Sequence, residues 1–215
     1  MTVENYIFEN AFVYLKDIFR EDCSGHDYYH SIRVYNNALN IAQKEGGNIF
    51  IIKLSALLHD VDDRKLFNTS NKLQNARKFL KDNCVDESSI EEICKIIKSV
   101  SFKGTESAIP DSTEGKIVQD ADRLDALGAI GIARTFAYGG YKGRPIYEPY
   151  EEPIENMTAE EYEIHISTSV NHFYEKLLKL KYLMNTDTAK SIAENRHLFM
   201  EEFLDKFINE WNGNY

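Results

Sequence analysis

Four side chains that commonly bind divalent metal ions stand in three separate parts of the chain. They are His30, the adjacent pair His59 and Asp60, and Asp122. Imidazole nitrogens and carboxylate oxygens together bind ions such as Mn, Mg, Co, Ni, Fe or Zn. The pair follows an apolar run, 49–58, where buried polar groups without partners would each cost free energy. One shared divalent ion would remove that cost, so the four residues are the candidate ligands.

The first candidate ligand belongs to a polar face. If residues 26–37 are helical, then His26, His30, Arg33 and Asn37 follow one another at helical offsets and share that face. This arrangement predicts one wall of a site. His26 would contact the substrate, support a metal ligand or simply begin the helix, and Arg33 would contact the substrate or pair with a metal-binding carboxylate.

The last candidate ligand lies in a segment that also has helical spacing. Asp122 and Asp125 are three residues apart and share a face, opposite an apolar stripe. Asp120 is less suited to be a ligand.

The elements that must position these side chains are helices. Apolar residues recur at spacings of three and four over 7–19 and 32–42, and the run 49–59 is apolar almost all round, as expected of a central helix. Gly46 and Gly47 close the second of these helices.

Two further helices follow in the middle of the chain. Asn68, Thr69 and Ser70 offer caps for a helix through about Lys81. Another helix, capped by Asp86 or Ser88, should end near Val100.

The second half of the chain continues the helical pattern. A loop over 101–114 precedes a helix predicted over Lys116–Phe136, and residues 138–156 form a long irregular segment rich in proline, glycine and tyrosine. That segment is either a lid over the substrate or an uninvolved loop. Two terminal helices are predicted within 158–213, over 158–184 and 187–211. The predicted fold is an all-α, single-domain helical bundle over residues 1–215.

Composition narrows the class of partner. The net charge of −10 disfavours binding to a nucleic-acid polymer, although a metal ion and a few basic side chains can still bind a small anion. The three cysteines are odd in number and have no close spacing, which favours a reducing compartment. With neither a signal peptide nor a membrane span in the sequence, we expect a cytoplasmic protein.

The sequence resembles the H…HD…D signature of the HD-domain metal-dependent phosphohydrolases, with His30, His59-Asp60 and Asp122 in the same order. Their contexts HDYYHSIRV, LLHDVDD and QDADRLDALGAIGIAR are most similar to a small bacterial branch, and the resemblance covers roughly His26–Arg134. It implies a metal-activated water that attacks a phosphorylated substrate, and the substrate expected is a nucleoside or deoxynucleoside triphosphate cleaved to monophosphate and pyrophosphate. There are two alternatives. The protein could cleave another phosphoester, or it could be a ligand-sensing module without turnover.

The resemblance also implies roles for single residues. Asp63 stands where related hydrolases carry an acidic catalytic residue, with the adjacent Asp62 as competitor. Members that bind two metals have extra histidines before the last aspartate, and residues 61–121 have none, so one ion is expected. Basic side chains must meet the phosphate charge, and the candidates are Arg33, Arg64, Lys65, Lys103, Lys142 and Arg144. His165, His172 and His197 are expected to be ordinary residues of the terminal helices.

Overall fold

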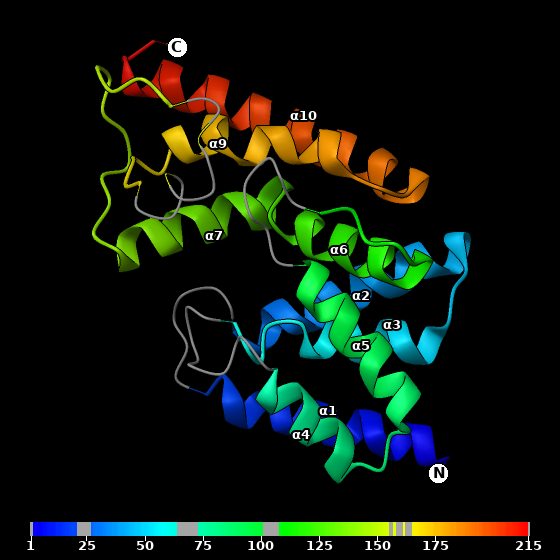
Figure 1. The fold of residues 1–215 in the computed structure, drawn as a ribbon. Coiled ribbons are helices and arrows are strands. Elements are labelled where there is room, and N and C mark those ends of the chain that lie inside the picture. The colour runs from blue at the N-terminus through cyan, green and yellow to red at the C-terminus, as the bar shows by residue number, and fades with distance from the viewer. Residues whose placement is uncertain are drawn as a thin grey trace. The chain divides into compact units, whose positions relative to one another are not determined.

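The computed structural model describes residues 2–20, 27–63, 73–100, 108–154, 157, 161 and 165–214. Every regular element within these ranges is a helix, which confirms the predicted all-α class (Figure 1). The chain divides into two compact units, and the division falls within one helix, after Asp122. The expectation of one domain over residues 1–215 stays a prediction. Within the described ranges, no helix has the length and hydropathy needed to cross a membrane.

The first unit is built around a central apolar helix. It contains α1 (Val3–Ile18), α2 (Tyr28–Glu45), α3 (Ile49–Leu58), α4 (Gln74–Asp82), α5 (Glu87–Val100) and most of α6 (Thr113–Asp125). α3 packs against α1, α2 and α5. Its Leu54, Leu57 and Leu58 side chains are fully buried, and burial of each contributes about 2 kcal/mol to folding. The helix that precedes the His59-Asp60 pair is therefore a rigid support.

The third helix begins at Ile49 as predicted, whereas the first begins at Val3, before the predicted apolar spacing, and the second begins at Tyr28. Thr2, Asp27 and Asn48 each accept a hydrogen bond from a backbone N–H in the first turn of the helix that follows. Gly46, with φ of +80°, ends α2 in a conformation that glycine adopts without steric strain. Local signals thus account for these boundaries.

The start of α4 differs from the prediction. The expected caps at residues 68–70 lie outside the described residues, and the helix begins at Gln74. Leu73 occupies the cap position with φ of +49° and makes no capping hydrogen bond through its side chain. The next helix, α5, has one of the expected caps, since Asp86 Oδ1 accepts from Ser89 N at 3.0 Å.

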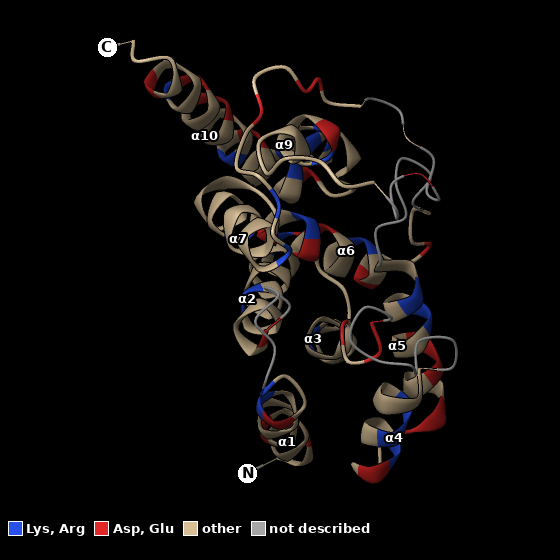
Figure 2. Cartoon of the chain, turned by 90° about the vertical axis from the view of Figure 1, so that its left-hand side faces the viewer, with Lys and Arg blue, Asp and Glu red and all other residues tan. Residues whose placement is uncertain are grey.

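Acidic and basic residues mix on the surface of α4 and α5 (Figure 2). Arg77 donates to both carboxylate oxygens of Glu91, and Lys78 pairs with Asp82 one turn away. The two signs largely offset each other on this surface.

The second unit has an aromatic core. It contains the end of α6, then α7 (Gly128–Tyr141), α9 (Asn171–Glu175), the 3-10 helix η1 (Leu177–Leu183) and α10 (Asp187–Trp211). α10 packs against α7 and η1. The rings of Phe136, Phe173 and Phe203 contact one another, with ring centroids 5.9–6.1 Å apart. The predicted last helix is confirmed.

The prediction of a single helix over Lys116–Phe136 is wrong. The chain turns at Ala126 and Leu127, between α6 and α7. An added Cβ at Gly131 would lie 2.2 Å from the carbonyl oxygen of Ala126, so the turn brings backbone against backbone. The small residues that fit a helix pattern serve this tight corner instead.

The helix predicted over 158–184 is also wrong where the structure describes it. Residues 165–168 are not helical, and only the short α9 and η1 follow. The buried Glu175 carboxylate accepts from Ser167 Oγ at 2.7 Å and lies 3.0 Å from His165 Nε2. A straight helix would separate residues 167 and 175 by about 12 Å, which excludes that contact. His165 therefore does not belong to a terminal helix.

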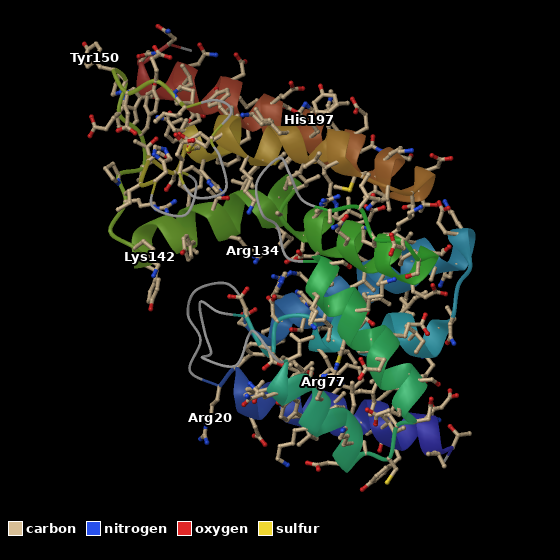
Figure 3. All side chains as sticks on the ribbon, viewed as in Figure 1. Arg20, Arg77, Arg134, Lys142, Tyr150 and His197 are labelled. Carbon is tan, nitrogen blue, oxygen red and sulfur yellow. The ribbon has the colours of Figure 1, made fainter. Side chains whose placement is uncertain are left out.

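The segment 142–154 has no helix or strand, as predicted, although α7 continues to Tyr141. Backbone hydrogen bonds from Ser169 N to Pro145 O and from Val170 N to Ile146 O, both 3.0 Å, hold it to the second unit. Tyr150, by contrast, is 98% exposed (Figure 3). A role as a lid stays a prediction.

Candidate metal centre

His30 enters the centre from the first turn of α2. Asp27 Oδ1 accepts a hydrogen bond from His30 N at 2.8 Å, which caps the helix and fixes the backbone that carries the imidazole. The side chain of His30 is 1% exposed. Its ring therefore has little freedom to turn away.

His59 and Asp60 enter from the end of α3. His59 Nδ1 lies 2.9 Å from Ala56 O, and because a carbonyl can only accept, Nδ1 carries the proton. In the neutral imidazole, Nε2 then has a free lone pair. This second hydrogen bond sets the tautomer that a metal ligand requires.

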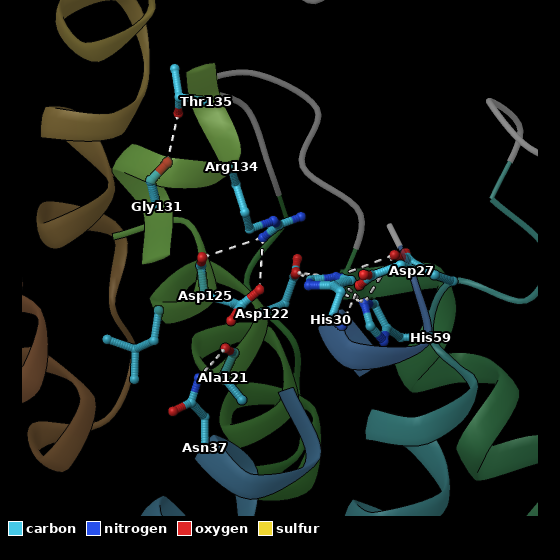
Figure 4. A network of polar contacts seen from close by, with 12 residues as sticks. Asp27, His30, Asn37, His59, Ala121, Asp122, Asp125, Gly131, Arg134 and Thr135 are labelled. Carbon is cyan, nitrogen blue, oxygen red and sulfur yellow. Dashed lines mark hydrogen bonds and ion pairs between the residues drawn. The ribbon is translucent and has the colours of Figure 1, made fainter. Parts of the chain in front are cut away.

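Asp122 enters the centre from α6, which follows the His59-Asp60 pair in the sequence. Asn37 Nδ2 donates to Ala121 O at 3.3 Å and so ties α2 to α6 beside the ligand. Figure 4 shows His30, His59 and Asp122 pointing toward one another. The Asp122 side chain is 27% exposed, so the centre has an accessible side.

The four predicted ligands converge within the first unit. His30 Nε2 lies 3.2 Å from His59 Nε2, and Asp60 Oδ2 lies 3.3 Å from both nitrogens. Asp122 Oδ1 lies 3.5 Å from His30 Nε2 and 3.8 Å from His59 Nε2. Among them, His30, His59 and Asp122 form a compact ligand group, with their ligand atoms all within 4.8 Å of one another.

These separations fit a divalent ion. A metal–ligand distance of about 2.1 Å places neighbouring ligand atoms about 3.0 Å apart in an octahedron and about 3.4 Å apart in a tetrahedron. Two imidazole nitrogens facing each other also need either a proton or a cation between them. The donor set and its spacing therefore agree with a metal centre.

Electrostatics favour a positive charge at the same place. Burial lowers the pKa of His59, but the carboxylates of Asp60 and Asp122 outweigh burial and raise this pKa from 6.5 to about 9. A cation is stabilised between these residues, whether it is a proton or a metal ion.

Asp62 and Asp63, the two aspartates that follow the His59-Asp60 pair, have different surroundings. Asp62 is 3% exposed, and its carboxylate accepts from two backbone N–H groups of α4. Asp63 is half-buried and continues the turn, since its N–H donates to Asp60 O at 3.0 Å. Asp62 therefore serves the start of α4, and the role of Asp63 as the acidic catalytic residue stays a prediction.

The remaining predicted residues are those expected to contact the substrate or its phosphate. Arg33 lies on α2 and is half-buried, whereas His26 and Lys103, like Arg64 and Lys65, lie outside the described residues. Lys142 and Arg144 belong to the second unit, where both cations lie over the Tyr138 ring.

Sequence reasoning missed the partner of Asp125. Arg134 on α7 donates to Asp125 Oδ2 at 2.8 Å and to its carbonyl oxygen at 3.3 Å. This pair secures the end of α6 and accounts for Asp125 without a metal. Asp27 was missed as well, although an aspartate directly before the first residue of a helix is a capping signal.

Comparisons with known proteins agree with this centre. The HD domain model matches residues 27–127, which include all four predicted ligands. The uncharacterised protein YpgQ of Bacillus subtilis is 38% identical over 199 residues, covering 91% of this chain and 89% of YpgQ. The chain belongs to the HD-domain family.

Solved structures are similar to nearly the whole chain. A Bacillus thuringiensis HD-superfamily hydrolase is 45% identical with a TM-score of 0.76, covering 97% of this chain and 98% of its own. A Lactobacillus plantarum protein is 41% identical with a TM-score of 0.86 over the same shares. YpgQ in complex with ADP is 33% identical with a TM-score of 0.76, covering 94% and 97%.

Family membership and the His-Asp centre together make this protein a metal-dependent phosphohydrolase. Its cofactor is a divalent metal ion, for which His30, His59 and Asp122 are grouped as possible ligands, with Asp60 beside them.

Proposed function

We propose that the protein hydrolyses a small nucleotide, and that its substrate is a nucleoside or deoxynucleoside triphosphate cleaved to monophosphate and pyrophosphate. The convergence of the predicted ligands beside the partly exposed Asp122 carries the proposal, because a phosphate oxygen can approach from that side. The YpgQ complex with ADP supports a nucleotide as the ligand class.

The residues of the chain have distinct tasks in this proposal. A divalent ion bound here supplies a Lewis acid that acidifies water and offsets phosphate charge. His30 and His59 remain neutral when they bind it, and Asp60 and Asp122 contribute the negative charges. Arg33, on the same helix as His30, contacts a phosphate oxygen.

Asp63 acts as the general base. Both carboxylate oxygens of Asp62 accept from backbone N–H groups of α4, whereas Asp63 lies three residues beyond the ligand Asp60 in the same turn. A general base of this kind contributes about 10²–10⁴-fold to rate.

The test is turnover of a nucleotide panel by the purified protein with Mn²⁺, Mg²⁺, Co²⁺ or Ni²⁺, with pyrophosphate and orthophosphate measured separately. We expect pyrophosphate and a monophosphate from at least one triphosphate. Asp60→Asn should be inactive, while the matched variant Asp205→Asn, on the exposed face of α10, should keep the wild-type rate.

Two results would contradict the proposal. Orthophosphate released from nucleoside monophosphates, with no pyrophosphate from any triphosphate, would point to a phosphomonoesterase. Metal binding without turnover of any nucleotide would remove nucleotides as the substrate class.

A further inference from the structure

The turn that carries Asp60 and Asp63 is joined to α4 by three hydrogen bonds. Asp62 Oδ1 accepts from Asn75 N at 3.0 Å, and Asp62 Oδ2 accepts from Ala76 N at 2.9 Å. In return, Asn75 Nδ2 donates to Val61 O at 2.7 Å. The two segments therefore satisfy each other's backbone groups although they are 13 and 14 residues apart in sequence.

Among the described residues, Asp62 supplies the acceptors at the start of α4, because the residue at the cap position does not. Leu73 occupies the cap position in the left-handed region, with φ of +49°, and its side chain cannot accept a hydrogen bond. The N–H groups of a first helical turn need acceptors, and a carboxylate there also meets the positive end of the helix dipole. Asp62 supplies both from outside the helix.

The same contact determines the direction of the neighbouring side chains. Val61 N donates to Leu58 O at 3.3 Å and Asp63 N donates to Asp60 O at 3.0 Å, so residues 58–63 form one continuous turn. Adjacent residues of such a turn move together. Holding Asp62 therefore keeps Asp60 Oδ2 at 3.3 Å from both imidazoles.

We propose that Asp62 is a positioning residue of the metal centre, which anchors the turn of Asp60 and Asp63 to the start of α4. In its effect on rate, this inference rests on the proposed function. In its effect on metal affinity it does not, because binding of Mn²⁺ requires no substrate.

The test compares Asp62→Ala and Asp62→Asn with Asp86→Ala. Asp86 is the matched control, since it also accepts from a helix N–H, Ser89 N at 3.0 Å, but caps α5 away from the turn. Mn²⁺ affinity, melting temperature, kcat and KM are measured for each. Replacing a partner that supports a ligand weakens metal binding about 10- to 100-fold.

We expect Asp62→Ala to weaken Mn²⁺ binding by that factor and to lower kcat at saturating Mn²⁺, with KM less affected. Asp62→Asn keeps one acceptor oxygen and should recover part of the affinity. Asp86→Ala should lower the melting temperature but leave Mn²⁺ affinity and kcat within about twofold of wild type.

If Asp62→Ala does not fold, Asn75→Ala provides a milder test, because it removes the bond to Val61 O and keeps the Asp62 carboxylate with its two backbone donors. It should weaken Mn²⁺ binding in the same direction. An Asp62 variant that loses only melting temperature, as Asp86→Ala does, would reduce the role to helix stability. A variant with unchanged Mn²⁺ affinity and a catalytic loss as large as that of Asp63→Ala would make Asp62 a catalytic group and overturn the proposal.

Discussion

Metal binding should weaken as the pH falls, because His59 must lose a proton before its Nε2 can bind an ion. Nδ1 donates to Ala56 O, so the second proton of the imidazolium occupies Nε2, the atom that faces His30 and Asp60. With a pKa of about 9, about 1% of His59 is neutral at pH 7. Apparent affinity should therefore fall about tenfold per pH unit, or about 100-fold between pH 8 and pH 6.

Calorimetric titration with Mn²⁺ at pH 6, 7 and 8 measures this dependence. Repeating it in two buffers of different ionisation enthalpy gives the proton release, which we expect to be about one proton per ion. An affinity that changes less than about threefold over this range, or binding without proton release, would refute the reasoning.

Asp60→Ala should abolish Mn²⁺ binding and hydrolysis together, whereas Asp63→Ala should keep Mn²⁺ affinity and lower kcat about 10²–10⁴-fold; equal loss of affinity would make Asp63 a ligand. Gly131→Ala should lower the free energy of unfolding in urea by about 1–3 kcal/mol or more, because the added Cβ would meet Ala126 O at 2.2 Å. Gly140→Ala, in the same helix but facing open space, should instead raise the free energy of unfolding by about 0.5–1 kcal/mol. Equal effects of the two substitutions would contradict the close backbone contact between Gly131 and Ala126. In EDTA, the raised pKa of His59 gives stability that is fully present below pH 6.5 and lost as the pH rises through about 9. Wild type should therefore lose more melting temperature than His59→Gln across that window, and equal losses would speak against the shift.

Local signals made the first unit predictable. The apolar run 49–58 predicts a buried helix, and the polar pair at its end predicts a site, because neither residue could be buried there without a partner. Gly46 marks the end of α2 through its positive φ. The four ligands converge as their order and contexts indicated.

Contacts between distant residues set the limits of that prediction. Ser167 and His165 reach Glu175 only because residues 165–175 do not form one continuous helix, and spacing alone cannot reveal this. The corner before Gly128 uses small residues that fit a continuous helix equally well. Asp62 caps a helix that begins twelve residues later, so no local pattern distinguishes it from Asp63.

Anomalous diffraction from crystals of the Mn²⁺-loaded protein tests the metal centre most directly. We predict one ion in the first unit, about 2.0–2.3 Å from His30 Nε2, His59 Nε2 and carboxylate oxygens of Asp60 and Asp122. An ion bound elsewhere, or one that contacts the two histidines but neither aspartate, would contradict it.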